Sequence, residues 1–249
     1  MKAVILAAGV ASRLKPLTDN TPKCLLNVGD KNILELTIDN IIANDIHDII
    51  IVTGYLEEQI RMFVSEKYPG LNVVYIYNEL YKSTNNIYSL WLAKDSTLGG
   101  EMLLMDSDIV FDGEIIAKLL ESGYDNCLAL KRHDVKEEEI KVKVDKKGSV
   151  IEIGKEVKIR EAIGESIGIE KFGAVTLIKL FNILDHKILV EQHVNLFYEA
   201  AFQDLVKDNE EIFIVDITNY ICMEIDTASD FEAAGKMILT QYKKTSFKS

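Results

Sequence analysis

A turn of small residues followed by basic side chains stands near the start of the chain and is suited to binding phosphate groups. Lys2 to Ala8 is apolar and rich in branched residues, which predicts a buried parallel strand. Gly9 to Ser12 follow, and their backbone N–H groups could hold an anion at the end of that strand. Arg13, Lys15 and Lys23 come next, so basic residues outnumber acidic ones over residues 1–30 although the whole chain carries a net charge of −12. This local excess of positive charge predicts a polyphosphate site.

Two common phosphate-binding motifs and an ordinary loop are the alternatives to this prediction. The dinucleotide-binding fingerprint G-x-G-x-x-G fails, because Ala11 and Leu14 stand where its second and third glycines belong. That failure disfavours a nicotinamide-dependent oxidoreductase, and the Gly-Lys-Ser/Thr of a Walker A loop is absent as well. Spacing alone leaves open an ordinary strand-to-loop turn whose basic side chains are solvated.

A longer pattern distinguishes between these alternatives. The segment LAAGVASRLKPLTDNTPKCLLNV, which begins at Leu6, closely resembles the signature L-A-A-G-x-G-[ST]-R-L-x-P-L-T-x-x-x-P-K-x-L-x-x-V of the nucleotidyltransferase family. The resemblance implies an enzyme that transfers a nucleoside monophosphate to a phosphorylated small acceptor. It also implies that Arg13 and Lys23 act in catalysis by gripping the phosphates of the nucleotide. The residues expected to contact the nucleotide here are Leu6, Ala7, Ala8 and Gly9.

Two residues depart from the signature. Ala11 replaces its second glycine, and Cys24 replaces the proline that usually follows the lysine. Because an alanine adds only a methyl group, we expect the loop to keep its shape if the φ of Ala11 is negative.

Acidic residues at the ends of two predicted strands are candidates for binding a metal ion. Transfer from a nucleotide requires its phosphate charges to be neutralised, usually by Mg²⁺, which prefers one or two protein carboxylates. The resemblance aligns Asp108, in Asp106-Ser107-Asp108, and Asp226, in Glu224-Ile225-Asp226-Thr227, with the metal-binding carboxylates of the family. Alternation along the second strand places Glu224 on the same face as Asp226, so either could be the ligand. Taken alone, Asp108 could be a turn former and Asp226 a helix N-cap.

The segment around Asn85 discriminates between nucleotides. Thymidylyl- and uridylyltransferases of the family carry a Gly-Thr/Ser-Ala type motif at about this place, whereas this sequence reads Asn-Asn-Ile-Tyr-Ser-Leu from Asn85. The segment resembles the CTP-dependent branch that acts on phosphocholine and 2-aminoethylphosphonate, and an asparagine amide can pair with both the donor and the acceptors of cytosine. Asn85 could also simply cap the helix that begins there. The nucleotide-binding residues expected in this part of the chain are Asn78, Asn85, Asn86, Ser89 and Asp106.

A second set of charged residues resembles the acceptor pocket of the family. Lys155 aligns with the lysine that binds the acceptor phosphate, and it is expected to act in catalysis by reducing the repulsion between two anions. A phosphate or phosphonate monoester is already ionised, so no general base is needed, and we interpret all four histidines as structural or surface residues. The resemblance adds Glu165 and Glu199 to the acceptor site, and Lys131 and Tyr198 are further candidates for it.

The composition of this region favours an acceptor with a primary amine or an amino-acid group. Residues 128–144 contain no Trp, Tyr or Phe, the residues that recognise a quaternary ammonium, and they offer Lys131, Arg132, Lys141 and Lys143 instead. Candidate acceptors are 2-aminoethylphosphonate and a phosphorylated amino acid or amide such as phosphoglutamine, activated for a surface glycan or lipid. Tyr198 and the preceding phenylalanine could still form a partial aromatic cage, which keeps phosphocholine as the alternative.

The leading hypothesis is therefore a cytidylyltransferase that uses CTP and Mg²⁺ and gives a CDP-type product and pyrophosphate. A sugar-1-phosphate nucleotidyltransferase using UTP or dTTP is disfavoured by Asn85 and Asn86. A nucleotide-sensing protein that has lost catalysis is disfavoured because the basic and acidic residues of the signature are present together.

The elements that must position these residues alternate along the first half of the chain. Strands are predicted at 2–8, 48–53, 72–77 and 102–105 and helices at 32–45, 56–68 and 85–94, which indicates a parallel sheet covered on both faces. Ligands of such sheets bind at the carboxyl ends of the strands, where the motifs fall. The β-rich second half has predicted strands at 126–131, 140–144, 150–153, 166–172, 211–217 and 220–225, with helices at 174–188, 196–207 and 230–243.

Together with the resemblance, this order predicts an α/β fold, a Rossmann-like three-layer sandwich with a mostly parallel mixed sheet. With 249 residues, 48% of them hydrophobic, the chain can form one domain over 1–249, with a nucleotide-binding portion 1–112 and an acceptor-binding portion 113–249. The acidic balance argues against nucleic acid or an anionic membrane as a partner. Three scattered cysteines, no signal peptide and no apolar run of transmembrane length predict a cytoplasmic protein. The oligomeric state is left open, a homodimer included.

Overall fold

The computed structural model describes the backbone of residues 1–246 and the side chains of residues 1–237. Within these residues, a nine-stranded mixed sheet has a main path in the order β10-β9-β11-β6-β1-β4-β5, while β8 pairs with β11 and β12 pairs with β8. β1, β4, β5 and β6 are parallel, and β11 runs antiparallel to β6. The strands of this sheet are β1 Lys2–Ala7, β4 Asp48–Thr53, β5 Asn72–Tyr77, β6 Met102–Asp106, β8 Cys127–Lys131, β9 Lys141–Val144, β10 Val150–Gly154, β11 Gly164–Phe172 and β12 Phe213–Asp216.

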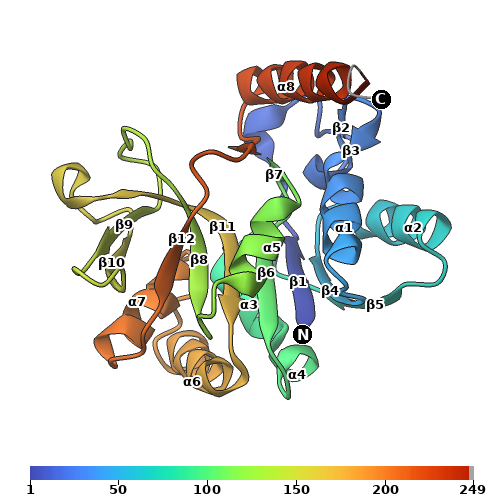
Figure 1. The fold of residues 1–249 in the computed structure, drawn as a ribbon. Coiled ribbons are helices and arrows are strands. Elements are labelled where there is room, and N and C mark those ends of the chain that lie inside the picture. Colours follow the sequence, from blue (N-terminus) through green and yellow to red (C-terminus); the bar gives the residue numbers. More distant parts are fainter. Residues whose placement is uncertain (247–249) are drawn as a thin grey trace.

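Alternation of side chains along β1 accounts for the three layers seen in Figure 1. Val4 and Leu6 point to one face of the sheet and pack in a core shared with α3, α6 and α7. Ala3 and Ile5 point to the opposite face, where the core is shared with α1, α2 and α5. The predicted three-layer α/β fold with a mostly parallel mixed sheet is thereby confirmed. These helices are α1 Ile33–Ala43, α2 Glu57–Lys67, α3 Asn86–Leu92, α5 Glu114–Glu121, α6 Ala174–Asp185 and α7 Glu199–Lys207.

The last helix, α8 Ala228–Ser246, packs over the N-terminal loop instead of the sheet (Figure 1). Leu14 and Leu26 of that loop form an apolar cluster with Ile225 and Ala234. The signature segment is therefore held between the sheet and the C-terminal part of the chain. Shorter elements complete the fold: β2 Asn27–Val28, β3 Lys31–Asn32, α4 Lys94–Thr97, β7 Ile109–Phe111 and β13 Cys222–Glu224.

The second half of the chain departs from the sequence expectations in three places. The prediction missed α5, whose buried apolar side chains lie at helical spacing within only eight residues. The strand expected at 220–225 does not join the main sheet, because β13 pairs antiparallel with β7 in a sheet of its own. The helix expected at 174–188 ends at Asp185 and gives way to a π-helical turn, His186–Val190, and the helix expected from 196 begins at Glu199.

Strands from both halves of the chain share the main sheet. The functional division into portions 1–112 and 113–249 stays a prediction. All three cysteines have free, buried thiols, as expected. Of the helices that the structure describes, none combines the length and the apolarity needed to cross a membrane.

Candidate active site

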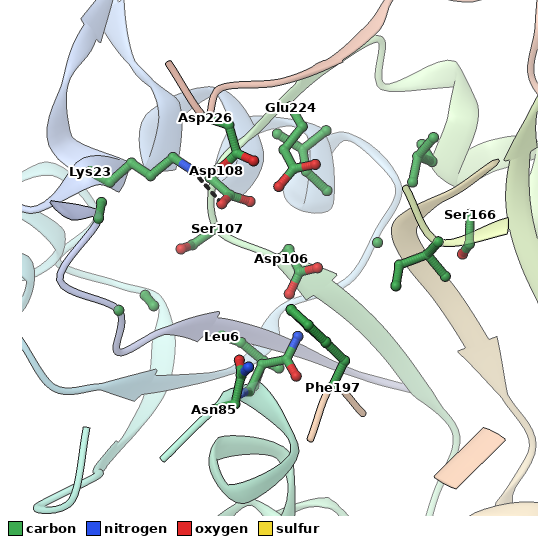
Figure 2. Close-up of a pocket in the computed structure, with 18 of the residues that line it drawn as sticks. Leu6, Lys23, Asn85, Asp106, Ser107, Asp108, Ser166, Phe197, Glu224 and Asp226 are labelled. Carbon is green, nitrogen blue, oxygen red and sulfur yellow. Dashed lines mark hydrogen bonds and ion pairs between the residues drawn. The ribbon is translucent and has the colours of Figure 1, made fainter. Parts of the chain in front are cut away.

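A cavity of about 940 Å³ opens at the carboxyl ends of β1 and β6. Every predicted site residue except Tyr198 lines it. Figure 2 shows the carboxylates of Asp108, Glu224 and Asp226 gathered on one side of this cavity, with Asp106 at the end of β6 below them. The cavity is at the large end of the range for small-molecule sites, which suits a nucleotide together with a small second substrate.

The loop after β1 forms an open part of the cavity wall. A Cβ built on Gly9 would meet no heavy atom within 4 Å, so this stretch of backbone is accessible to a ligand. Ala8 is held from the other side, because its carbonyl oxygen accepts a hydrogen bond from the N–H of Tyr55 at 3.1 Å. A glycine is needed at position 54, since a Cβ there would lie 2.7 Å from the same carbonyl oxygen.

Ala11 does not have the negative φ that would accommodate an alanine without strain. Its φ is +50°, in the left-handed region. The carbonyl oxygen of Ala11 accepts hydrogen bonds from the N–H of Leu14 at 3.1 Å and from the hydroxyl of Thr18 at 3.0 Å, and these contacts hold the loop in this shape. The left-handed conformation costs a residue with a Cβ about 1 kcal/mol, which accounts for the glycine of the signature.

Three carboxylates gather beside two basic side chains. Oxygen atoms of Asp108, Glu224 and Asp226 lie within 4.8 Å of one another. Lys23 Nζ lies 2.6 Å from Asp108 Oδ2 and 3.0 Å from Asp226 Oδ1, and Arg13 donates to Asp226 Oδ2 at 2.8 Å. Burial lowers the pKa of Lys23, but the attraction of Asp108 and Asp226 outweighs this effect and the pKa is raised. Burial and repulsion from the two aspartates raise the pKa of Glu224 to about 8.

This set of donors fits a divalent cation such as Mg²⁺. Asp108 Oδ1 is buried and has no hydrogen-bond partner in the part of the chain that the structure describes. Mg²⁺ prefers carboxylate oxygens, and its charge would relieve the repulsion acting on Glu224. The sequence left Glu224 and Asp226 as alternatives, whereas the structure brings both within reach of Asp108.

The pairing of two short strands accounts for the convergence of these carboxylates. β6 ends at Asp106 and the chain turns at once, so Asp108 stands on the turn that leads into β7. β7 pairs with β13 in a register that sets Ile109 opposite Glu224. The N–H of Ile225 then donates to the carbonyl oxygen of Asp108 at 2.9 Å, which fixes the second acidic segment against the first.

Asp226 is fixed by the cap of the helix that follows it. Asp230 Oδ2 accepts hydrogen bonds from the N–H groups of Asp226 at 3.2 Å and Thr227 at 2.7 Å, and the N–H of Asp230 donates to the Thr227 hydroxyl at 3.3 Å. This reciprocal pattern is a capping box in which Thr227, not Asp226, caps α8. The carboxylate of Asp226 is therefore directed to the basic side chains of the site.

The asparagines near α3 have defined structural roles. Asn85 is the N-cap of α3, because its Oδ1 accepts a hydrogen bond from the N–H of Asn86 at 2.8 Å. Asn78 is buried, and its Nδ2 donates to the hydroxyls of Thr84 at 3.2 Å and Ser89 at 3.1 Å. These bonds hold the segment that lines the cavity beside Leu6 (Figure 2). A contact between these asparagines and a cytosine stays a prediction.

Lys155 stands on the other side of the cavity. Its Nζ lies 3.2 Å from Glu138 Oε2 and 4.5 Å from the centre of the Phe197 ring, so the ammonium covers that aromatic face. A lysine placed there can meet an anionic group that enters the cavity opposite Lys23.

Of the four basic residues expected to suit a phosphate or carboxylate, Lys131, Arg132, Lys141 and Lys143, only Lys131 lines the cavity, and Lys136 of the same segment lines it as well. Its Nζ donates to the carbonyl oxygen of Cys222 at 2.8 Å. Arg132 pairs with an aspartate of β12, and Lys143 pairs with two glutamates. Lys141 is completely buried.

His133 is exposed, as the interpretation of the histidines as structural or surface residues allows, and it also lines the cavity. Its Nε2 lies 2.9 Å from Glu139 Oε2 and 3.5 Å from Glu165 Oε2. Burial, followed by the repulsion of Glu139, raises the pKa of Glu165 to about 7. His133 lies two residues after Lys131, which is the last residue of β8 and a predicted site residue. This closeness in sequence was the signal that could have pointed to His133.

A group of acids lies in and behind one wall of the cavity: Asp106 and Glu199 line it, and Glu170 is fully buried. The ring of Tyr198 is fully buried and does not line the cavity; its hydroxyl donates to Asp106 Oδ2 at 3.0 Å and lies 3.5 Å from Glu170 Oε2. Burial raises the pKa of Asp106 and of Glu170 well above their usual ranges. Glu199 is 4% exposed, and its Oε2 has no hydrogen-bond partner among the described residues. Burial raises the pKa of Glu199 to about 7, although Lys155 opposes the shift.

Comparison with known proteins identifies the family. The family model described as nucleotidyl transferase matches residues 2–154. The chain belongs to the nucleotidyl transferase family. It is 30% identical to the choline-phosphate cytidylyltransferase of Streptococcus pneumoniae over 93% of this chain and 95% of that protein. It is 28% identical to the CTP:phosphoglutamine cytidylyltransferase of Campylobacter jejuni (93% and 98%) and 28% identical to the 2-aminoethylphosphonate cytidylyltransferase of Lancefieldella rimae (93% and 90%).

Solved structures agree with this assignment. The CTP:phosphocholine cytidylyltransferase from Streptococcus pneumoniae superimposes with a TM-score of 0.79 at 26% identity, covering 95% of this nucleotidyltransferase and 98% of that chain. The inositol-1-phosphate CTP transferase from T. maritima has a TM-score of 0.78 at 19% identity over 94% and 95% of the two chains, which bears on the fold alone. The predicted family, enzyme class and fold are confirmed.

Proposed function

We propose that this nucleotidyltransferase transfers CMP from CTP to a small phosphorylated or phosphonate acceptor that carries a primary amine or an amino-acid group. The observation that carries the proposal is the distribution of charge in one cavity. Arg13 and Lys23 lie beside three carboxylates, and Lys155 interacts with the buried carboxylate of Glu199, whose Oε2 has no hydrogen-bond partner among the described residues. The three curated relatives are, by name, cytidylyltransferases of phosphorus-bearing acceptors, which supports both CTP and this acceptor class.

Each charged group has a role in this reaction. Arg13 and Lys23 bind the triphosphate together with the open backbone at Gly9, and Lys155 binds the acceptor phosphate or phosphonate and reduces the repulsion between the two anions. The ionised acceptor oxygen forms a bond to the α-phosphorus while the bond from that phosphorus to the β-phosphate oxygen breaks, so pyrophosphate leaves and no general base is required. Asp108, Glu224 and Asp226 would hold Mg²⁺, which when bound neutralises phosphate charge.

The lining of the cavity supports an acceptor with N–H donors. Among the described residues, the aromatic side chains that line the cavity are Tyr81 and Phe197, and Lys155 covers the face of the Phe197 ring. The Tyr198 ring packs in the core instead. A quaternary ammonium is recognised by open aromatic faces, whereas a primary ammonium can donate hydrogen bonds to a carboxylate such as that of Glu199.

Phosphocholine is the second candidate acceptor. The 30% identity to a choline-phosphate cytidylyltransferase over most of both chains favours it. Two further alternatives differ in class: a sugar-1-phosphate nucleotidyltransferase that uses UTP or dTTP, and a nucleotide sensor without catalysis.

A pyrophosphate-release assay distinguishes these functions. CTP would be compared with UTP, dTTP, ATP and GTP, each with 2-aminoethylphosphonate, phosphoglutamine and phosphocholine as acceptors. We expect turnover with CTP and the highest kcat/KM with an amine-bearing acceptor. Equal use of UTP would contradict the nucleotide assignment, and a tenfold higher kcat/KM with phosphocholine would replace the amine by the second candidate. Binding of CTP in calorimetry without any pyrophosphate release would favour the sensor.

The carboxylates can be tested with a matched control. We expect Asp108→Asn and Asp226→Asn to lower magnesium-dependent pyrophosphate release by about a hundredfold or more, because each removes a charged metal ligand. Asp95→Asn changes an exposed aspartate on α4, away from the cavity, and should retain full turnover. Circular dichroism verifies that the variants are folded, and near-normal turnover of both site variants would remove the metal assignment.

A further inference from the structure

Lys141 is a lysine buried without a carboxylate partner. It belongs to β9, is 0% exposed, and lies under the turn formed by residues 136–139. Its Nζ donates to the carbonyl oxygens of Glu137 at 2.7 Å, Glu139 at 3.3 Å and Lys136 at 3.4 Å. In the part of the chain that the structure describes, no acidic side chain lies within ion-pair distance of this ammonium.

The hydrogen bonds between the ammonium and the carbonyl oxygens of the turn account for a lysine at this buried position. A buried ammonium is unfavourable unless its N–H donors are all paired, and here three donors meet three carbonyl oxygens. A methionine at position 141 would fill similar space within the sheet but would remove the donor that the carbonyl oxygens of Glu137 and Glu139 have here, while that of Lys136 would keep the N–H of Glu139. Lys141 therefore stabilises the conformation of the 136–139 turn, since packing within the sheet could be provided by an apolar side chain of similar size.

The turn forms one wall of the active-site cavity. Lys136, Glu138 and Glu139 line the cavity, and Glu138 reaches across to Lys155 at 3.2 Å. Glu139 Oε2 accepts hydrogen bonds from the N–H of Lys136 at 2.8 Å and is 2.9 Å from the His133 ring. The conformation of the turn thus controls where these side chains stand, including the one that contacts Lys155.

We propose that Lys141 is a positioning residue of the acceptor site. Its hydrogen bonds to the carbonyl oxygens fix the conformation of the 136–139 turn, and Glu138 of that turn holds Lys155 where the acceptor phosphate binds. The proposal rests on the proposed function, because that function gives Lys155 its role. Lys141 does not touch a substrate and acts only through the turn. The nucleotide side of the cavity is built from other elements and does not depend on the hydrogen bonds between Lys141 and the turn.

Kinetics with two lysine variants of the same strand test the proposal. Lys143 is two residues from Lys141, and its Nζ pairs with Glu152 at 2.8 Å and Glu161 at 2.7 Å outside the cavity. We expect Lys141→Met to raise the KM for the acceptor about tenfold while the KM for CTP changes by less than about twofold, because only the acceptor wall is loosened. Lys143→Met should leave both values unchanged, and Lys141→Arg should recover part of the loss. An unchanged acceptor KM, or an equal rise in both KM values, would overturn the proposal.

Limited proteolysis gives a readout that does not depend on catalysis. Trypsin cleaves after Arg132, which precedes the turn, after Lys136, its first residue, and after Lys147 in the exposed β9–β10 turn, which serves as the internal reference. We expect cleavage at Arg132 and Lys136, relative to Lys147, to become about tenfold faster in Lys141→Met than in the wild type. Equal relative rates of cleavage in the two proteins would contradict the proposal that Lys141 fixes the turn.

Two outcomes are kept separate by this design. If Lys141→Met fails to fold, Val135→Ala loosens the same segment from its apolar side, since Val135 is 9% exposed, and an acceptor KM equal to the wild-type value would then overturn the proposal. If the wild-type enzyme releases no pyrophosphate from CTP with any acceptor, the proposed function fails, while the relative rates of trypsin cleavage still decide whether Lys141 pins the turn.

Discussion

Replacing Glu199 by glutamine should make the protein less sensitive to alkaline pH. Burial raises the pKa of Glu199 from its ordinary value of 4.5 to about 7. The folded protein therefore keeps a proton that the unfolded chain releases above pH 4.5, so stability falls as pH rises from 4.5 to 7 and stays low above that range. A difference of about 2.5 between the two pKa values corresponds to about 3 kcal/mol, most of which falls between pH 5 and pH 8.

Urea unfolding at pH 5 and pH 8 measures this effect. The fluorescence of the single tryptophan, Trp91, which packs partly buried against the core, can report unfolding. We expect the stability of Glu199→Gln relative to wild type to be higher at pH 8 than at pH 5 by about 2 to 3 kcal/mol. Subtracting the stability difference measured at pH 5 from that measured at pH 8 removes any effect of the amide that does not depend on pH. The variant Glu58→Gln, which changes an exposed residue of α2, controls for the loss of one negative charge. A relative stability that is the same at both pH values would refute the reasoning.

Three further predictions follow from contacts around the cavity. Ala11→Gly should raise the free energy of unfolding by about 1 kcal/mol in urea, because it removes a Cβ from a backbone with φ +50°, and a lower value would contradict the strain. Lys23→Met should tighten Mn²⁺ binding in the absence of nucleotide about tenfold, measured by electron paramagnetic resonance, because the ammonium no longer occupies the carboxylates, while turnover with CTP falls; weaker Mn²⁺ binding would contradict this competition. Gly168→Ala should lower kcat/KM about tenfold, because its Cβ would lie 2.5 Å from Asp106 Oδ2, and unchanged kinetics would show that the position of Asp106 is unimportant.

Most of the site was predictable because its residues sit on sequence motifs at strand ends. The strands around β1 are parallel, so their carboxyl ends meet at one edge of the sheet whatever the details of packing. Asp108 and the loop from Gly9 to Lys23 therefore had to face one cavity once the parallel sheet was predicted. The resemblance to the family then added Lys155, which lies far along the chain but in the same cavity.

Other features depend on which distant segment a strand pairs with or a side chain packs against. The local sequence pattern does not contain that information. β13 pairs with β7 instead of the main sheet, which is why Glu224 joins Asp108 and Asp226. The aromatic ring of Tyr198 enters the core and leaves its neighbour Phe197 to line the cavity.

The sequence by itself determined the family and the positions of the parallel strands along the chain, and it predicted the basic and acidic residues that line the cavity, because these follow from motifs and from side-chain periodicity. Only the tertiary structure decided that Ala11 takes a left-handed conformation and that His133 faces the cavity. It also decided that Lys141 turns inward to bind the carbonyls of a turn. The physical reason is that burial, hydrogen-bond partners and backbone strain belong to the packed chain, where each is set by segments distant in sequence.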